Sequence, residues 1–135
     1  MTTLKEVREA MARLLQGGTG LDAIAYVPAT PRAGTVFVRP ANSERAIDYR
    51  GQTATFCKPE HFMKAVLISG TADWSNALDW LEDYQERVVQ TIKANPKCDG
   101  LINSWSVSHI SEPLLWGDFL TADIHFGSFV LRSSS

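Results

Sequence analysis

Apolar residues recur at helical spacing near the start of the chain. Thr3 and Glu6 match a capping box, in which each side chain satisfies a backbone N–H group of the first helical turn. The apolar positions that follow are Leu4, Val7, Met11, Leu14 and Leu15. This pattern predicts a short amphipathic helix, which we expect to end at Gly17 and Gly18.

A second helical pattern predicts the longest helix of the chain. It begins after Asp73 or Ser75, either of which can cap the first turn, and it stops at Asn95–Pro96. The apolar residues that share one face of this helix are Ala77, Leu81, Tyr84, Val88 and Ile92. The opposite face is acidic, which is typical of a solvated surface.

Strand patterns precede this long helix. The runs 21–27 and 35–39 are rich in β-branched and aromatic residues, and prolines and a glycine separate them. Residues 62–69 are apolar on both alternating faces except at Lys64. A run of this kind predicts a strand that is buried on both sides, at the centre of a sheet.

Two further alternating stretches, 102–110 and 119–131, follow the long helix. The second stretch places on one face Leu120, Ala122, Ile124, Phe126 and Val130. We expect a hairpin between the two stretches, with residues 111–118 as the connection. Residues 114–117 (LLWG) concentrate large apolar side chains in this connection. Either they fold back over the end of the sheet or they contact another molecule.

Together these elements predict a single α+β domain over residues 1–132, with 133–135 as a frayed end. Its expected core is a mainly antiparallel sheet of about four to six strands, with one long helix packed on it and a shorter N-terminal helix. Residues 40–60 show little regular pattern apart from a short apolar stretch at 54–57. Long irregular loops in compact domains are usually functional or disordered, so this loop is a candidate functional region.

The composition of the chain argues against several classes of protein. The chain has 135 residues, and 13 Lys and Arg against 15 Asp and Glu give a formal charge of −2, which argues against a dedicated nucleic-acid binder. Cys57 and Cys98 are far apart in the sequence, so we expect two reduced core thiols. The charged N-terminus lacks the pattern of an export signal, and no apolar run is long enough to span a bilayer. We expect a soluble protein made in the cytoplasm.

Signatures of catalysis are missing from the sequence. No serine lies in a Gly-x-Ser-x-Gly turn, and the glycines at 17–20 lack the lysine of a phosphate-binding loop. The three histidines, His61, His109 and His125, lie on separate predicted strands. His109 and His125 can face each other across the final hairpin, but two imidazoles without a third ligand make a weak metal site. We expect no catalytic residues, no metal, no cofactor and no enzymatic activity.

Several segments taken together carry a likeness to a known family: TLKEVREA (3–10), AYVP (25–28), TVFVRP (35–40), Asp48–Tyr49, AVLISGTAD (65–73), ALDWL (77–81) and the strand 120–126. In this order they resemble the small tail terminator and neck (head–tail joining) proteins of long-tailed bacteriophages. The likeness extends over most of the chain as a pattern of elements.

This resemblance implies a structural protein of the virion tail or neck. Such subunits form a homohexameric ring on the head-proximal end of the tail tube. There the ring stops polymerisation of the major tail tube protein and docks the head connector or stopper protein. Genomic DNA passes through the ring without specific binding, and no membrane is involved. A ring of this type forms when a heterologous contact closes on itself after a fixed rotation.

Residues that could form the contacts are large or charged and lie in the two irregular segments. The candidate interface residues are Arg45, Asp48, Tyr49, Arg50, Leu114, Leu115 and Trp116. One alternative is a head-completion or stopper protein of the same neck. Others are a small-molecule-binding or enzymatic α+β domain, with its pocket between the long helix and the sheet, and a monomeric adaptor.

Overall fold

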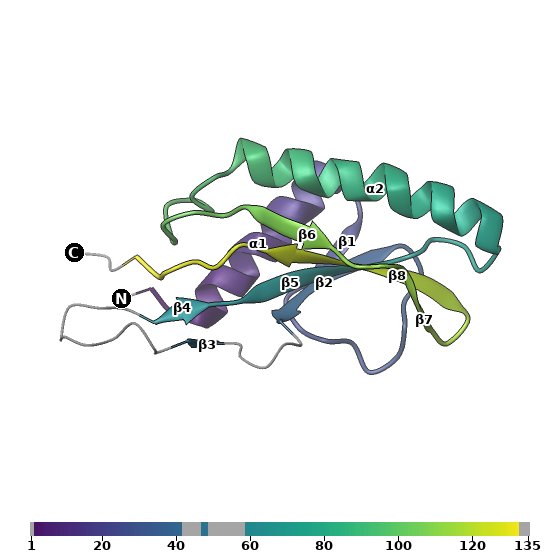
Figure 1. Cartoon of the computed structure of the whole chain (residues 1–135), viewed down its shortest axis with the longest axis horizontal. Helices are drawn as coiled ribbons and strands as arrows, with labels where there is room; N and C mark the ends of the chain where they lie inside the picture. The colour runs from purple at the N-terminus through teal and green to yellow at the C-terminus, as the bar shows by residue number, and fades with distance from the viewer. Residues whose placement is uncertain (1, 42–46, 49–58, 133–135) are drawn as a thin grey trace.

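The computed structural model describes residues 2–41, 47–48 and 59–132, with only the backbone at 47–48. In these residues the chain is α+β, with two helices, a mixed six-stranded sheet and a separate strand pair (Figure 1). The elements are α1 (Leu4–Thr19), β1 (Asp22–Ile24), β2 (Thr35–Pro40), β3 (Ile47–Asp48), β4 (Glu60–His61), β5 (Met63–Ile68), α2 (Trp74–Ala94), β6 (Val107–Ile110), β7 (Leu114–Trp116) and β8 (Phe119–Phe126).

Both helices begin where the capping residues indicate. The Thr3 hydroxyl accepts a hydrogen bond from the Glu6 backbone N–H at 3.2 Å, and the Asp73 carboxylate accepts one from the Ser75 N–H at 3.3 Å. α2 ends at Asn95, as expected. These ends are set by short-range contacts, which is why the sequence is sufficient to place them.

The expected end of α1 at Gly17 and Gly18 is wrong. The helix continues to Thr19 and ends at Gly20, which adopts a left-handed conformation with φ 79°. Gly18 lies where α1 meets α2, and a Cβ at that position would clash with the Thr91 side chain. Gly18 therefore permits close contact between the helices, and Gly20 ends the helix.

The main sheet has the strand order β1-β2-β5-β8-β6, and β7 also pairs with β8. All six residues of the central strand β5 are buried, as its pattern predicts. Every pair in this sheet is antiparallel except β1–β2, which is parallel, so the sheet is mixed. The connection between β1 and β2 returns the chain to the end where β1 began, because Asp22 lies opposite Thr35.

Several strands are shorter than their sequence patterns. β1 covers three residues of the run 21–27, and β6 covers only the last four residues of 102–110. β8 ends at Phe126, and isolated bridges such as Ile102↔Leu131 continue the pairing beyond it. The apolar stretch 54–57, which includes Cys57, lies outside the described residues.

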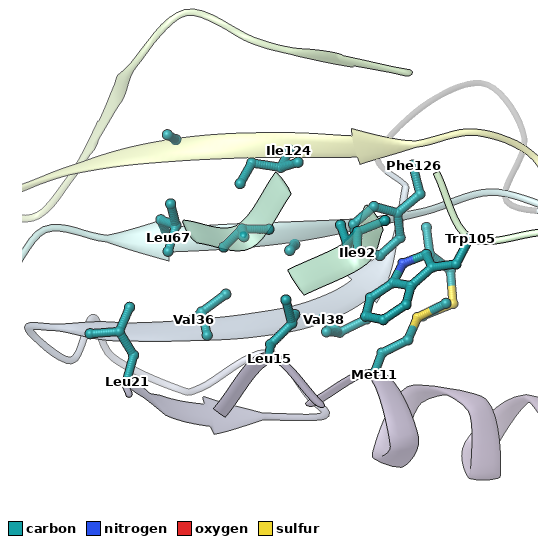
Figure 2. Close-up of a cluster of buried hydrophobic side chains, with 14 of the residues drawn as sticks. Met11, Leu15, Leu21, Val36, Val38, Leu67, Ile92, Trp105, Ile124 and Phe126 are labelled. Atoms are coloured by element: carbon teal, nitrogen blue, oxygen red, sulfur yellow. The ribbon is translucent and has the colours of Figure 1, made fainter. Parts of the chain in front are cut away.

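The sheet has a core on each face. On one face the sheet packs against both helices, and Figure 2 shows Met11 and Leu15 of α1 and Ile92 of α2 facing the sheet side chains. Cys98 is fully buried in this core, and burial raises the pKa of its thiol to about 12. The opposite face carries a smaller cluster, formed by Ile24, Phe37, Val66 and Ile68 with Trp116 and Phe119 packed against it. In the described residues no helix is long and apolar enough to cross a membrane.

Candidate functional site

The outer edge of β8 is occupied by two short strands in place of one long one. β6 pairs with residues 124–126 of β8 and β7 pairs with residues 119–121, on the side away from β5. Between them the Ser111 N–H donates to the Asp123 carbonyl at 2.9 Å, which keeps the connection close to β8. We call β6, β7 and their connection the split edge.

Apolar side chains are exposed along the split edge. Ile110, Leu114 and Leu115 are 37%, 60% and 54% exposed. Ile110 lies opposite Ile124, and Leu115 lies opposite Leu120 on the helix side of the sheet. Leu114 lies opposite Thr121, on the other side. A strand placed beside β7 would therefore meet apolar side chains on both faces of the sheet.

The backbone of β7 also offers hydrogen-bonding groups. Residues 117 and 118 connect Trp116 to its partner Phe119, and Gly117 has φ 62°, as the first position of a type II′ turn requires. In such a hairpin the pair next to the turn exchanges backbone hydrogen bonds and the following pair does not. The N–H and C=O of Leu115 therefore point away from β8. Among the described residues, no further strand lies beyond β6 and β7.

Trp116 fixes the position of β7. Its ring is half-buried and packs edge-to-face on Phe37 of β2, with ring centroids 5.9 Å apart and planes at 71°. The turn next to it is also tight, since a Cβ on Gly117 would lie 3.3 Å from Pro31 Cγ in the β1–β2 connection. Of the two alternatives for residues 114–116, folding back applies to Trp116, whereas both leucines remain exposed.

The opposite edge of the sheet is protected by α1. The Ala23 N–H of β1 donates to Gln16 Oε1 at 3.3 Å, and Arg8 Nη1 donates to the Ala25 carbonyl at 3.3 Å. Asp22 forms an ion pair with Arg32 at 3.1 Å. Side chains of α1 thus occupy one backbone N–H of β1 and the carbonyl just beyond its end, at the edge where a neighbouring strand would otherwise pair.

A row of basic side chains crosses the sheet on the face away from the helices. Arg39 of β2, Lys64 of β5 and His125 of β8 lie opposite one another in register, and His109 of β6 completes the row. Lys64 Nζ contacts Asp123 Oδ2 at 2.6 Å, and these side chains are only 7% and 15% exposed. Lys64, the one charge in the central strand pattern, is therefore neutralised by a carboxylate two residues from His125.

His109 and His125 face each other, as the sequence predicted. Their rings stack at 4.3 Å between centroids and 9° between planes. His125 Nε2 hydrogen-bonds Ser111 Oγ at 2.8 Å, and His109 Nδ1 hydrogen-bonds Ser108 Oγ at 3.1 Å. Burial lowers the pKa of His125, and the neighbouring His109 and Lys64 lower it further, while Asp123 opposes them. In the described parts of the chain, no three His, Cys, Asp or Glu side chains gather to hold a metal ion.

The other candidate interface residues lie elsewhere. Arg45, Tyr49 and Arg50 are outside the described residues. Asp48 lies in β3, whose backbone pairs with Glu60 of β4. Ile110 was missed as a candidate, although it closes an alternating run directly before the apolar connection. The basic row could not be found from the sequence, because it depends on the register of four strands.

A groove of about 580 Å³ lies between the two helices. The space between the long helix and the sheet is filled by the core. At the rim of the groove Arg87 lies 3.1 Å from Asp83 and Arg13 lies 2.9 Å from Asp99, while Glu86 accepts a hydrogen bond from Gln90 Nε2 at 3.0 Å.

Comparison of the chain with protein-family models and with curated proteins found no match.

Proposed function

We propose that this chain is a ring-forming structural subunit of the bacteriophage tail terminator type, and that copies associate through the split edge. The observation that carries the proposal is the exposed apolar pair Leu114 and Leu115 on a strand whose outer backbone groups face away from the sheet. Exposed edge strands of this kind are sites of strand addition.

The difference between the two sheet edges bears on the symmetry of assembly. An edge that pairs with itself gives a closed dimer, whereas an edge that binds a different surface gives a ring or a filament. Because α1 occupies the β1 edge, a second copy cannot extend the sheet through β1; in the proposed ring it binds the split edge with a surface other than its own split edge. This arrangement is heterologous and is compatible with a closed ring.

The element order supports the family. The proposal keeps the architecture that the resemblance implies, with a mainly antiparallel sheet, one long helix packed on it and a shorter N-terminal helix. In the proposed assembly six copies form the ring at the head-proximal end of the tail tube, between the tube protein and the head connector. Six copies at −2 each would carry a formal charge of −12, which disfavours binding of DNA phosphates during passage.

The mass of the assembly tests this proposal. We expect the purified chain, alone or on added tail tubes, to form a ring, and the double variant Leu114→Ser/Leu115→Ser to lose it. Leu78→Ser is the matched control, because Leu78 is also an exposed leucine, at 43%, but lies on α2. The proposal is contradicted if the chain and its Leu78→Ser control form only a dimer, or if the chain stays monomeric even on tail tubes.

Electron microscopy of particles that lack the protein separates the two neck roles. Overlong or headless tails support termination of the tube. Filled heads without tails would instead assign the chain to a head-completion or stopper role.

A further inference from the structure

The histidine pair lies at the middle of the contact that holds β6 in the sheet. Only three residue pairs join β6 to β8: Val107↔Phe126, His109↔His125 and Ile110↔Ile124. The register shifts between Val107 and His109, so one side of the contact is irregular. The stacked rings therefore lie at the middle of the contact that fixes β6, between the Gly127 N–H to Ser106 carbonyl and the Ser111 N–H to Asp123 carbonyl bonds, both 2.9 Å, and β6 is half of the split edge.

The charges around the pair suit neutral rings. From β5, Lys64 faces His125 directly, and Arg39 of β2 is next in the same row. From β8 itself, the Asp123 carboxylate is close, but it already contacts Lys64 at 2.6 Å. The remaining polar partners, Ser108 and Ser111, are hydroxyl groups that carry no charge. Added protons on the pair would thus meet mainly positive neighbours.

We propose that the stacked His109–His125 pair is an acid-sensitive latch, which holds β6 against β8 while the rings are neutral and releases β6 when they are protonated. The proposed consequence for assembly depends on the function proposed above, because release of β6 would remove half of the split edge. The latch itself is a property of the single chain.

The direction of the pH effect follows from His125. Its pKa in the closed state is lowered from the ordinary 6.5. The open state, with an exposed ring, therefore takes up a proton at a higher pH than the closed state. As pH falls below the ordinary value, the open state gains relative to the closed state. β6 is expected to be protected above this pH and to lose protection below it.

Hydrogen exchange of the β6 amides tests the latch. Exchange is measured by mass spectrometry at about pH 7.5 and about pH 5, after correction for the intrinsic pH dependence of amide exchange. A dilution at which the chain is monomeric is used. We expect opening of residues 107–110 to increase severalfold at the lower pH, in the direction set by the lowered pKa of His125. His109→Gln should reduce this increase, because it removes the ring that stacks on His125 and that adds to the effect of burial in lowering the His125 pKa.

His61→Gln is the control, because His61 is not part of the pair and its ring stacks on Phe129 instead. It should retain the increase at β6. Equal protection of β6 at both pH values, or the same increase in His109→Gln, overturns the latch. If His109→Gln does not fold, an NMR titration of the wild-type chain decides: the β6 amides must shift with the midpoint of the His125 ring.

The latch and the proposed assembly can fail separately. Exchange in the monomer tests the latch alone, and ring mass at about pH 7.5 tests the assembly alone. If both hold, rings of the wild-type chain should form at about pH 7.5 and dissociate at about pH 5.

Discussion

At one edge of the sheet, side chains of α1 hydrogen-bond the Ala23 N–H of the three-residue strand β1 and the Ala25 carbonyl just beyond it, whereas at the other edge β6 and β7 expose apolar side chains. Proteins usually protect both edges of an open sheet, because an exposed edge pairs with other chains. The assembly that we propose uses the edge that is left exposed. The two edges also differ in what holds them in place, because an aromatic contact and the histidine pair hold the exposed edge.

The largest effect is expected when the anchor of the exposed edge is removed. Trp116→Ala should lower the free energy of unfolding by about 2 to 3 kcal/mol, because it deletes a half-buried aromatic ring and its contact with Phe37. Urea denaturation measures the loss, and amide exchange should show that β7 opens first. Leu115→Ala, which changes a side chain that is 54% exposed, should stay within about 0.5 kcal/mol of wild type.

For this reason Trp116 is a poor position at which to test assembly. Its replacement by a small residue would weaken both the fold and any contact between copies, so loss of assembly would have two causes. The exposed leucines beside it give the cleaner test. A Trp116→Ala variant as stable as wild type would show that the edge does not depend on this contact.

A smaller effect is expected at the helix that protects β1. Gly18→Ala should destabilise the chain by about 2 kcal/mol, since the added methyl group would clash with the β-branched side chain of Thr91. Gly17→Ala should stabilise it by about 0.5 to 1 kcal/mol, because Gly17 lies in the helix with open space around its Cα. Thermal or urea unfolding of the two variants measures the difference. Equal stability in the two variants would show that α1 and α2 do not meet at Gly18.

These glycines also show what the sequence could and could not predict. The caps at Thr3 and Asp73 and the buried run of β5 were predicted correctly, because neighbouring residues determine them. The role of Gly18 was not, because it depends on Thr91 in another helix. The same reason explains the parallel β1–β2 pair, whose direction is set by a long connection and not by either strand.

The candidate site was predicted less completely than the fold. Residues 114–116 were recognised as unusual but were assigned to a loop, since three consecutive apolar residues do not alternate. They form a strand because Trp116 packs on Phe37, which is far away in the sequence. The facing of His109 and His125 was predicted from hairpin pairing, but the alignment of Lys64 and Arg39 with them required the register of the whole sheet.

Acid is expected to affect the whole fold through a third histidine, separate from the edge. His61 is 6% exposed, its Nδ1 has no hydrogen-bond partner in the described structure, and burial lowers its pKa. The unfolded chain therefore binds a proton at higher pH, so stability falls as pH drops below the ordinary value of 6.5. His61→Phe should keep the stacking on Phe129, raise stability by about 1 kcal/mol and flatten this dependence.

Urea midpoints at about pH 7.5 and about pH 5 measure this effect. The variant also sharpens the comparison of the edges, because it removes a global response to acid and leaves the local response of β6. An unchanged pH dependence in His61→Phe would show that other groups determine acid stability.

The smallest effect on stability, and the most direct test of the contrast, is expected at Gln16. Its exposed amide accepts the Ala23 N–H at 3.3 Å, so Gln16→Ala should cost only about 0.5 kcal/mol in unfolding experiments. The substitution nevertheless frees a backbone donor on β1, which makes the protected edge more like the split edge. We expect concentration-dependent association, measured by sedimentation, that persists when Leu114 and Leu115 are replaced by serine. If Gln16→Ala associates no more than wild type, the Gln16 side chain is not what keeps the β1 edge closed, and the asymmetry of the sheet must come from the packing of α1 itself.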